Sequence, residues 1–160
     1  MTLRQYRTSL GITLQEASLS TGVALRTYNR YEQDERSGSS LKRNAIINIL
    51  KSKYEVTEDK GVLTVDKIKE TVSKIFIEYN EQIEFCYLFG SYSKGLAKDN
   101  SDVDLCISTS LEGLDFVDLI ETLRENLHKK VDLIRLSDLN DNIELVNEIM
   151  KTGIRIYGQY

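Results

Sequence analysis

The sequence predicts a small all-α domain followed by an α/β (α+β) domain that is built on a mixed sheet. Helical spacing of apolar residues fills the first 54 residues, whereas helix and strand patterns alternate beyond residue 62. The charge also changes sign: residues 1–60 carry 10 Lys and Arg against 7 Asp and Glu, and residues 61–160 carry 11 against 18. A polar segment without helical period lies between the two parts, so we expect domains at 1–58 and 62–160.

The composition excludes several classes of protein. With 41% apolar and 29% charged residues in a chain of 160, the sequence is typical of a globular protein, not of a disordered, fibrous or membrane-embedded one. No apolar segment follows Met1 as a signal peptide would require. Two cysteines, Cys86 and Cys106, make neither a disulfide framework nor a zinc site, and we expect packed thiols. We therefore expect a cytoplasmic protein without a membrane partner.

The first part is expected to contain four helices, over residues 2–10, 13–22, 25–33 and 40–54. Thr13 and Glu16 form a capping-box pattern at the start of the second helix, and Gly22 is placed to end it. Apolar residues at helical spacing in the fourth helix predict a stripe that faces the core. This stripe consists of Leu41, Ala45, Ile46, Ile49 and Leu50.

Helices and strands alternate in the second part. Short apolar runs predict strands over 83–89, 103–108, 131–136 and 154–157. Helical spacing predicts helices over 65–79, 116–127 and 143–150, the first of them capped by Thr64. The last helix is lined by Ile143, Val146, Ile149 and Met150. His128, beside Lys129 and Lys130 at the end of the middle helix, is expected to be a solvated cation.

A phosphate-binding loop is expected directly after the first strand of this part. Gly90-Ser91 follows residues 83–89, and a glycine there lets backbone N–H groups and a hydroxyl approach an anion closely. Lys94 and Lys98 add positive charge nearby. Each feature alone is typical of an ordinary turn, but both fall at the end of an expected strand.

Carboxylates follow on the next two strands. Asp102 and Asp104 are two residues apart, so both side chains lie on one face of a strand. Two such carboxylates repel each other unless a cation lies between them, and hard oxygen ligands suit Mg²⁺ together with substrate phosphates. Asp132 can face the same site if strands 103–108 and 131–136 are neighbours. The sequence thus places three acidic groups around one candidate site.

This arrangement resembles a known family. Gly90-Ser91, ten residues, then Asp102-Val103-Asp104 is similar to the signature of DNA polymerase β-like nucleotidyltransferases, and LFGSYSKGLAKDNSDVDL resembles their minimal, MNT-type branch. The resemblance covers residues 62–160. It implies that Asp102, Asp104 and Asp132 are catalytic and hold two Mg²⁺ ions, and that Gly90, Ser91 and Lys94 bind the phosphates of ATP.

The first part resembles a Cro/λ-repressor-type (Xre) helix-turn-helix domain. TLQEAS and TGVALRTYNRYE carry the resemblance, which implies a buried ion pair between Arg7 and Glu32. Ala24 departs from the pattern, because a Ser or Thr normally caps the third helix there. Side chains of the types that bind base edges or phosphates are expected to contact DNA, and such domains act as dimers on two half-sites. The expected DNA-binding residues are Gln15, Arg26, Thr27, Asn29 and Arg30.

Three functions remain open at this stage. MNT-type proteins resemble antitoxins that transfer AMP from ATP to a tyrosine of a HEPN-type toxin, and a helix-turn-helix on the same chain suits autorepression on operator DNA. A DNA-binding antitoxin that neutralises its partner by binding alone, with an idle transferase site, is the second. A small-molecule nucleotidyltransferase of the aminoglycoside-modifying kind is the third. Replacing Asp102 and Asp104 by Asn distinguishes the first from the second.

Overall fold

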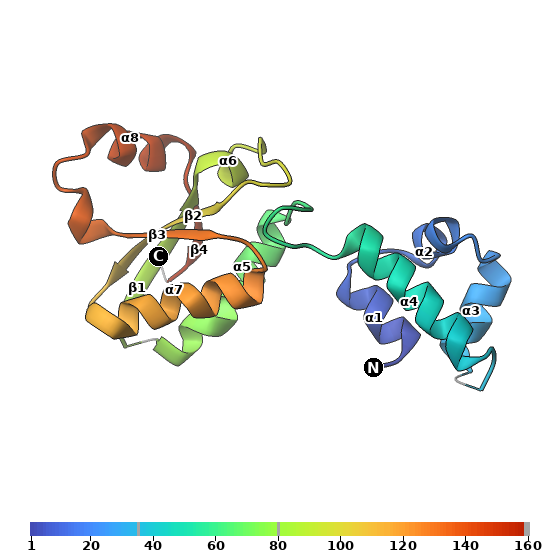
Figure 1. The fold of residues 1–160 in the computed structure, drawn as a ribbon. Helices are drawn as coiled ribbons and strands as arrows, with labels where there is room; N and C mark the ends of the chain where they lie inside the picture. Colours follow the sequence, from blue (N-terminus) through green and yellow to red (C-terminus); the bar gives the residue numbers. More distant parts are fainter. Residues whose placement is uncertain (35, 80, 159–160) are drawn as a thin grey trace. The chain divides into compact units, whose positions relative to one another are not determined.

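The computed structural model describes residues 1–34, 36–79 and 81–158 (Figure 1). The chain forms two compact units, Met1–Glu55 and Val56–Tyr160. Residues 56–61, which the sequence places at the domain boundary, group with the second unit. No helix among the described residues is both long enough and apolar enough to cross a membrane.

The first unit consists of the four expected helices. They are α1 (Leu3–Ser9), α2 (Leu14–Thr21), α3 (Leu25–Gln33) and α4 (Ser40–Tyr54). Thr13 and Glu16 form the expected capping box on α2, and Gly22 ends this helix with a left-handed φ of 68°. Ala24 at the start of α3 makes no side-chain capping hydrogen bond, as the sequence predicts.

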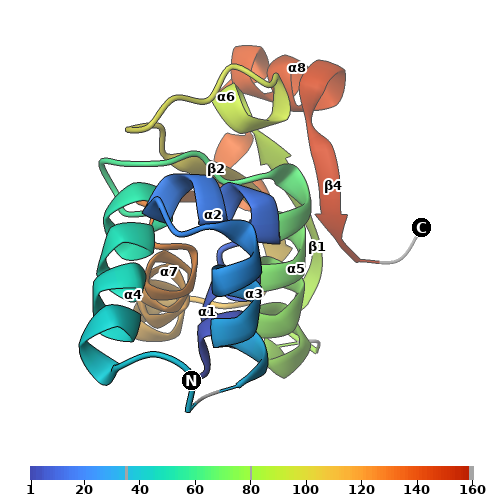
Figure 2. The same cartoon turned by 90° about the vertical axis from the view of Figure 1, so that its right-hand side faces the viewer.

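The core of this unit lies where α1 and α2 each contact both α3 and α4 (Figure 2). It contains Leu3, Ala17, Tyr28, Tyr31, Ile46 and Leu50. The expected Arg7–Glu32 ion pair is present: Nε of Arg7 lies 2.7 Å from Oε1 of Glu32, and both side chains are nearly buried. Arg7 also donates to the carbonyl oxygen of Ile12 at 2.7 Å, so this pair fixes the turn between α1 and α2.

The expected apolar stripe on α4 is only partly buried. Ile46 and Leu50 are in the core, but Leu41 is 79% exposed, and Ala45 and Ile49 are exposed as well. The prediction was wrong for these three residues because the side of α4 that packs on the core is formed by Ile46, Ile47, Leu50 and Tyr54, and residues 41, 45 and 49 lie on another side of the helix. Helical periodicity alone does not show which of two apolar sides of a helix meets its neighbours.

The second unit is built on a four-stranded mixed sheet. Its strands are β1 (Ile83–Phe89), β2 (Val103–Thr109), β3 (Val131–Arg135) and β4 (Ile154–Tyr157), in the order β3-β2-β1-β4. β1 is antiparallel to both β2 and β4, and β2 is parallel to β3. The predicted fold class is confirmed, and each predicted strand exists with its ends within one residue of those expected.

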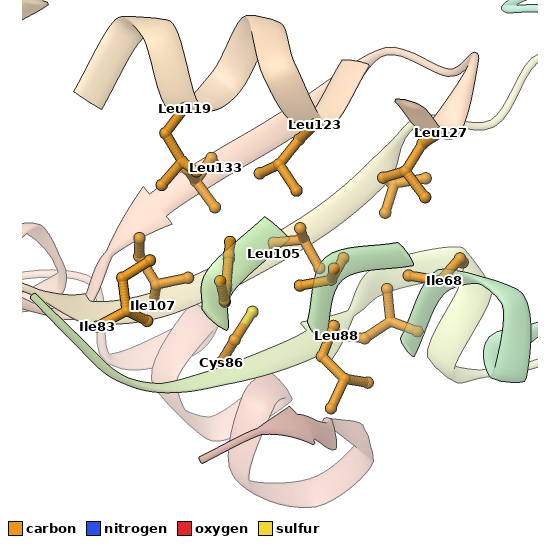
Figure 3. Packing of buried hydrophobic residues seen from close by; sticks show 14 of the residues in the cluster. Ile68, Ile83, Cys86, Leu88, Leu105, Ile107, Leu119, Leu123, Leu127 and Leu133 are labelled. Atoms are coloured by element: carbon orange, nitrogen blue, oxygen red, sulfur yellow. The ribbon is translucent and has the colours of Figure 1, made fainter. Parts of the chain in front are cut away.

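Helices α5 (Val65–Phe76) and α7 (Gly113–Leu127) cover one face of the sheet (Figure 1). Leu119, Leu123 and Leu127 follow one line of α7 and point at the sheet, where they meet side chains such as Leu105 and Leu133 (Figure 3). This is the main core of the unit. Every other residue of β2 joins it, so the alternate residues, Asp104 and Cys106, point to the opposite face.

The opposite face carries the shorter helices. They are α6 (Gly90–Ser93), the 3₁₀ turn η2 (Leu136–Leu139) and α8 (Ile143–Thr152). The other 3₁₀ turn, η1 (Ile77–Tyr79), directly follows α5. Only Ile149 of the expected α8 stripe is buried, in a small cluster with Phe89, Cys106 and Leu139. Ile143, Val146 and Met150 are exposed, contrary to expectation, because α8 contacts β1, α6 and η2 along one side only.

Candidate active site

The structure brings the three predicted carboxylates to one end of the sheet. Asp104 and Asp132 are directly paired in the parallel ladder of β2 and β3, so their side chains leave the same face. Phe89, the last residue of β1, pairs with Asp104 from the other side, and Gly90 follows at once. Asp102 immediately precedes β2. The neighbouring strands on which the position of Asp132 depended are therefore present.

Burial and the neighbouring negative charges in this group shift the pKa of Asp104. Its pKa is raised from 3.8 to about 6, first by burial and then by the negative charges of Asp132, Asp102 and Glu148. The backbone N–H of Ser91 acts in the opposite direction and lowers the pKa. Asp102 and Asp132 are exposed, whereas Asp104, on the inner strand β2, is partly buried. Negative charges therefore converge on a partly buried carboxylate.

The carboxylate of Asp104 leaves no room for a side chain at residue 90. The φ of Gly90 is +70°, and a Cβ at this position would lie 2.0 Å from Oδ2 and 2.8 Å from Cγ of Asp104. The end of β1 and the carboxylate of β2 therefore fit together only without a side chain at residue 90. The loop then closes on itself, with the N–H of Leu96 donating to the carbonyl of Ser91 at 2.9 Å.

Lys94 is close to this group but has a partner that the sequence does not reveal. Its Nζ donates to Oε1 of Glu148 on α8 at 2.6 Å, and both side chains are about one third exposed. The carboxylate of Glu148 also contributes to the raised pKa of Asp104. Glu148 lies on the polar side of an amphipathic helix 44 positions beyond Asp104, so no local pattern singles it out.

The predicted DNA-binding residues lie on α2 and α3. Arg26 and Arg30 are exposed and one helical turn apart, Thr27 and Asn29 are partly exposed on the same helix, and Gln15 is exposed in the first turn of α2. The turn between the helices is fixed by Ser18, whose hydroxyl donates to the carbonyl of Val23 at 2.7 Å. Helix α3 is anchored by Tyr28 and Tyr31, which are buried.

Comparison with known protein families gives a match for each of the two units. Residues 70–160, more than half of the chain, match the polymerase beta, nucleotidyltransferase family. This chain is a member of that family. Residues 3–43 of the nucleotidyltransferase also match a helix-turn-helix family, which covers α1 to the start of α4.

Two named proteins are similar to this nucleotidyltransferase. One is protein adenylyltransferase MntA of Shewanella oneidensis, 27% identical over 89 residues, which are 54% of this chain and 63% of that protein. This chain thus spans less than two thirds of the MntA protein. The other, from Methanocaldococcus jannaschii, is provisionally named a protein adenylyltransferase and is 35% identical over 75 residues, 44% of this chain and 87% of that protein.

Among solved structures, one described as a toxin-antitoxin with AMP-PNP is similar to this nucleotidyltransferase. The similarity has a TM-score of 0.50 and 26% identity, and it covers 57% of this chain and 73% of that chain.

The residues of the site fit Mg²⁺ in the manner of such a nucleotidyltransferase. Within residues 1–34, 36–79 and 81–158, no three His, Cys, Asp or Glu side chains are gathered closely enough to hold a metal by themselves. Mg²⁺ is usually bound through one or two carboxylates, with the remaining positions filled by water and substrate phosphates. The convergence of negative charge on Asp104 matches this use. Asp102 and Asp104 would hold the ion, and Asp132 would complete the acidic group.

Proposed function

We propose that this chain is a Mg²⁺-dependent adenylyltransferase that transfers AMP from ATP to a tyrosine of a HEPN-type toxin, and that it acts as the antitoxin. The carboxylate cluster carries the proposal: Asp104 packs against Gly90 and is paired with Asp132 on the next strand. The names of the two similar proteins, and the toxin-antitoxin structure with the ATP analogue AMP-PNP, support protein adenylylation. The MNT-type motif from Leu88 to Leu105 supports a HEPN partner.

The proposed roles of the residues follow from their positions. Gly90 and Ser91 bind phosphate oxygens through backbone N–H groups and the hydroxyl, and Lys94 leaves Glu148 to neutralise another phosphate oxygen. Asp102 and Asp104 hold Mg²⁺, which when bound neutralises phosphate charge and stabilises the leaving pyrophosphate.

Asp132 accepts the proton of the acceptor hydroxyl. The hydroxyl oxygen then forms a bond to the α-phosphorus, and the bond from the α-phosphorus to the bridging oxygen breaks. AMP remains on the acceptor and pyrophosphate leaves. The protein thus contributes positioning and charge more than covalent chemistry.

The decisive experiment follows the α-phosphate. The purified chain is incubated with Mg²⁺, ATP labelled on the α-phosphate, and, as the candidate partner, the product of the neighbouring gene. We expect labelled AMP on that partner and a mass increase of one or more AMP units. A γ-labelled control should leave no label, and Asp102→Asn/Asp104→Asn should abolish transfer. Asp115→Asn/Asp118→Asn removes the same charge from the exposed side of α7 and should transfer normally.

The same variant separates the proposal from its alternatives. If Asp102→Asn/Asp104→Asn still neutralises the toxin in cells, the chain acts by binding alone and the adenylylation proposal fails. AMP transfer to an aminoglycoside, with none to a protein, would favour the small-molecule enzyme.

We further propose that the first unit binds operator DNA and represses the operon that encodes both partners. The match of residues 3–43 to a helix-turn-helix family supports this role, as do the exposed Arg26 and Arg30 on α3. A homodimer on two half-sites is the expected form, because one short recognition helix covers only a few base pairs. We place the protein in the cytoplasm, where both ATP and DNA are found.

A further inference from the structure

Lys129 is a fully buried lysine, with 0% of its surface exposed. It lies between the end of α7 and Lys130, the residue that precedes β3. The sequence gives no signal for this burial, and His128, the residue before it, is exposed as expected. His128 has a left-handed φ of 54°, which ends α7 and lets the chain turn so that the next side chain points inward. A buried ammonium group outside the motif needs an explanation, because burial of a charge is costly unless it is paired.

The ammonium group of Lys129 is satisfied by three backbone carbonyls. Its Nζ donates to the carbonyl oxygens of Glu58 at 3.2 Å and of Lys60 at 3.5 Å, and to that of Asp99 at closer range. An ammonium has three N–H donors, so every donor has an acceptor. Burial lowers the pKa of Lys129, whereas the charges of Asp99, Asp59 and Asp102 raise it.

The three carbonyls belong to two separate segments. Glu58 and Lys60 lie in residues 56–61, which follow the helix-turn-helix unit directly and close on themselves through Thr57 and Lys60. Asp99 lies in the loop that leads from the phosphate-binding segment to Asp102. Lys129 therefore joins the first residues of the second unit to the loop that presents a carboxylate of the active site.

Both carboxylate strands begin at this point. The N–H of Val103 donates to the carbonyl of Lys130 at 2.9 Å, which starts the parallel pairing of β2 with β3. Asp102 lies one residue before this hydrogen bond, and Asp132 lies two residues after Lys130 on the paired strand. A shift of the Asp99 loop would therefore displace Asp102 relative to Asp104 and Asp132.

We propose that Lys129 is a positioning residue for the metal-binding carboxylates, because it ties the Asp99 loop to residues 56–61. This rests on the proposed nucleotidyltransferase function. Groups that orient metal ligands typically change metal affinity by about 10- to 100-fold when they are removed. An apolar side chain in the same place would take the ammonium donor away from all three carbonyls, of which that of Lys60 keeps the N–H of Thr57. The Asp99 loop would therefore rearrange to regain a hydrogen bond.

A matched pair of variants tests the proposal. Lys129→Met removes the link between the two segments. Arg124→Gln is the control, because Arg124 forms an ion pair with Glu58 and so holds residues 56–61 without touching the Asp99 loop. Hydrogen exchange of the full-length, metal-free protein is measured by mass spectrometry, and AMP transfer is measured as a function of Mg²⁺ concentration.

We expect Lys129→Met to speed amide exchange in residues 98–102 about tenfold while β1 stays as protected as in the wild type. The half-saturating Mg²⁺ concentration should rise about tenfold, with kcat at saturating Mg²⁺ within about twofold of the wild type. Arg124→Gln should change neither the exchange of 98–102 nor the Mg²⁺ dependence.

Unchanged exchange in 98–102 with unchanged Mg²⁺ dependence would overturn the proposal. A uniform loss of protection that includes β1 would also overturn it, because Lys129 would then stabilise the whole unit only. If Lys129→Met does not fold, Lys129→Gln keeps two N–H donors, and the same local exchange and Mg²⁺ shifts are expected at smaller size. If the wild type transfers no AMP, the proposed function fails, while the exchange data still decide whether Lys129 holds the loop.

Discussion

Gly90 and the carboxylate of Asp104 leave no room for a further atom between them. A Cβ at residue 90 would lie 2.0 Å from Oδ2 of Asp104, and the left-handed φ of +70° adds strain for any other residue. Gly90→Ala should therefore turn the Asp104 carboxylate out of its position. We expect loss of at least about 100-fold in AMP transfer and about 1–3 kcal/mol in the free energy of unfolding.

Gly95→Ala is the matched control for this variant. Gly95 lies in the same loop with nearly the same φ, +69°, but apart from its two chain neighbours no atom of the described residues lies within 4 Å of the point that a Cβ would occupy there. The variant should lose about 1 kcal/mol of stability from backbone strain and keep most of its activity. Equal activity losses in the two variants, measured at a temperature where both are folded, would show that the contact with Asp104 is unimportant.

The raised pKa of Asp104 predicts how stability depends on pH. Because the folded pKa is about 6 and the ordinary value is 3.8, the folded state binds this proton more tightly than the unfolded state does. In the metal-free protein this carboxyl group therefore lowers stability progressively as pH rises from about 4 to about 6, and the loss persists above that range.

Asp104→Asn removes the charge and therefore this loss. Its free energy of unfolding relative to the wild type should be highest above about pH 6 and should decline towards about pH 4. Urea unfolding at several pH values in the presence of a chelator measures this difference. Asp118→Asn, which removes the same charge from the exposed side of α7, is the control. A difference that stays constant with pH would refute the electrostatic explanation.

At the scale of the element, α3 begins without a cap. Ala24 has a non-helical backbone, with φ −52° and ψ 137°, but its side chain offers no acceptor for the first N–H groups of the helix. Thr2, Thr13 and Thr64 supply that acceptor on α1, α2 and α5. Ala24→Thr should therefore raise the free energy of unfolding of the first unit by about 1 kcal/mol, measured by thermal denaturation.

Ala24→Val has the shape of Thr without the hydroxyl and provides the control. It should be neutral or slightly destabilising. If both variants stabilise the unit equally, added apolar surface and not the capping hydrogen bond is responsible.

The elements that the sequence predicts well are those with local signals. Thr13, Glu16 and Gly22 mark both ends of α2, and the apolar runs of β1 and β4 end at the predicted residues. The exposed Leu41 and Met150 show the limit, because burial depends on which neighbour covers a helix and not on the helix itself. The same limit applies to α8, whose apolar side is longer than its contact with the sheet.

The residues of the candidate site also divide into those that a local sequence pattern predicts and those that none predicts. Gly90, Ser91, Asp102 and Asp104 form one local pattern, and Asp132 could be added only on the condition that strands 103–108 and 131–136 are neighbours. Glu148 and Lys129 could not be predicted. Each reaches the site through contacts between segments more than 25 positions apart, and each looks in the sequence like an ordinary charge on a solvated helix.

At the scale of the whole molecule, the two units have separate cores and opposite charges. Residues 1–55 hold nine Lys and Arg against five Asp and Glu, whereas residues 56–160 hold 12 against 20. The acidic unit repels DNA, so DNA binding must depend on the few basic side chains of the first unit. The two proposed activities should therefore be separable by substitution in the full-length chain.

Arg26→Ala/Arg30→Ala tests this separation. Each lost phosphate contact reduces the dependence of log affinity on log salt by about 0.9, so the slope should fall by nearly 2 in magnitude. Fluorescence anisotropy with DNA from upstream of the gene, at several salt concentrations, measures it. Lys51→Ala/Lys53→Ala removes the same charge from the end of α4 and should leave the slope almost unchanged if α3 is the contacting helix. Equal effects of the two pairs would mean that general charge, not α3, binds DNA. AMP transfer should remain at the wild-type level in both variants. The substituted residues lie in the first unit, whereas the carboxylate site lies in the second unit, which has a core of its own.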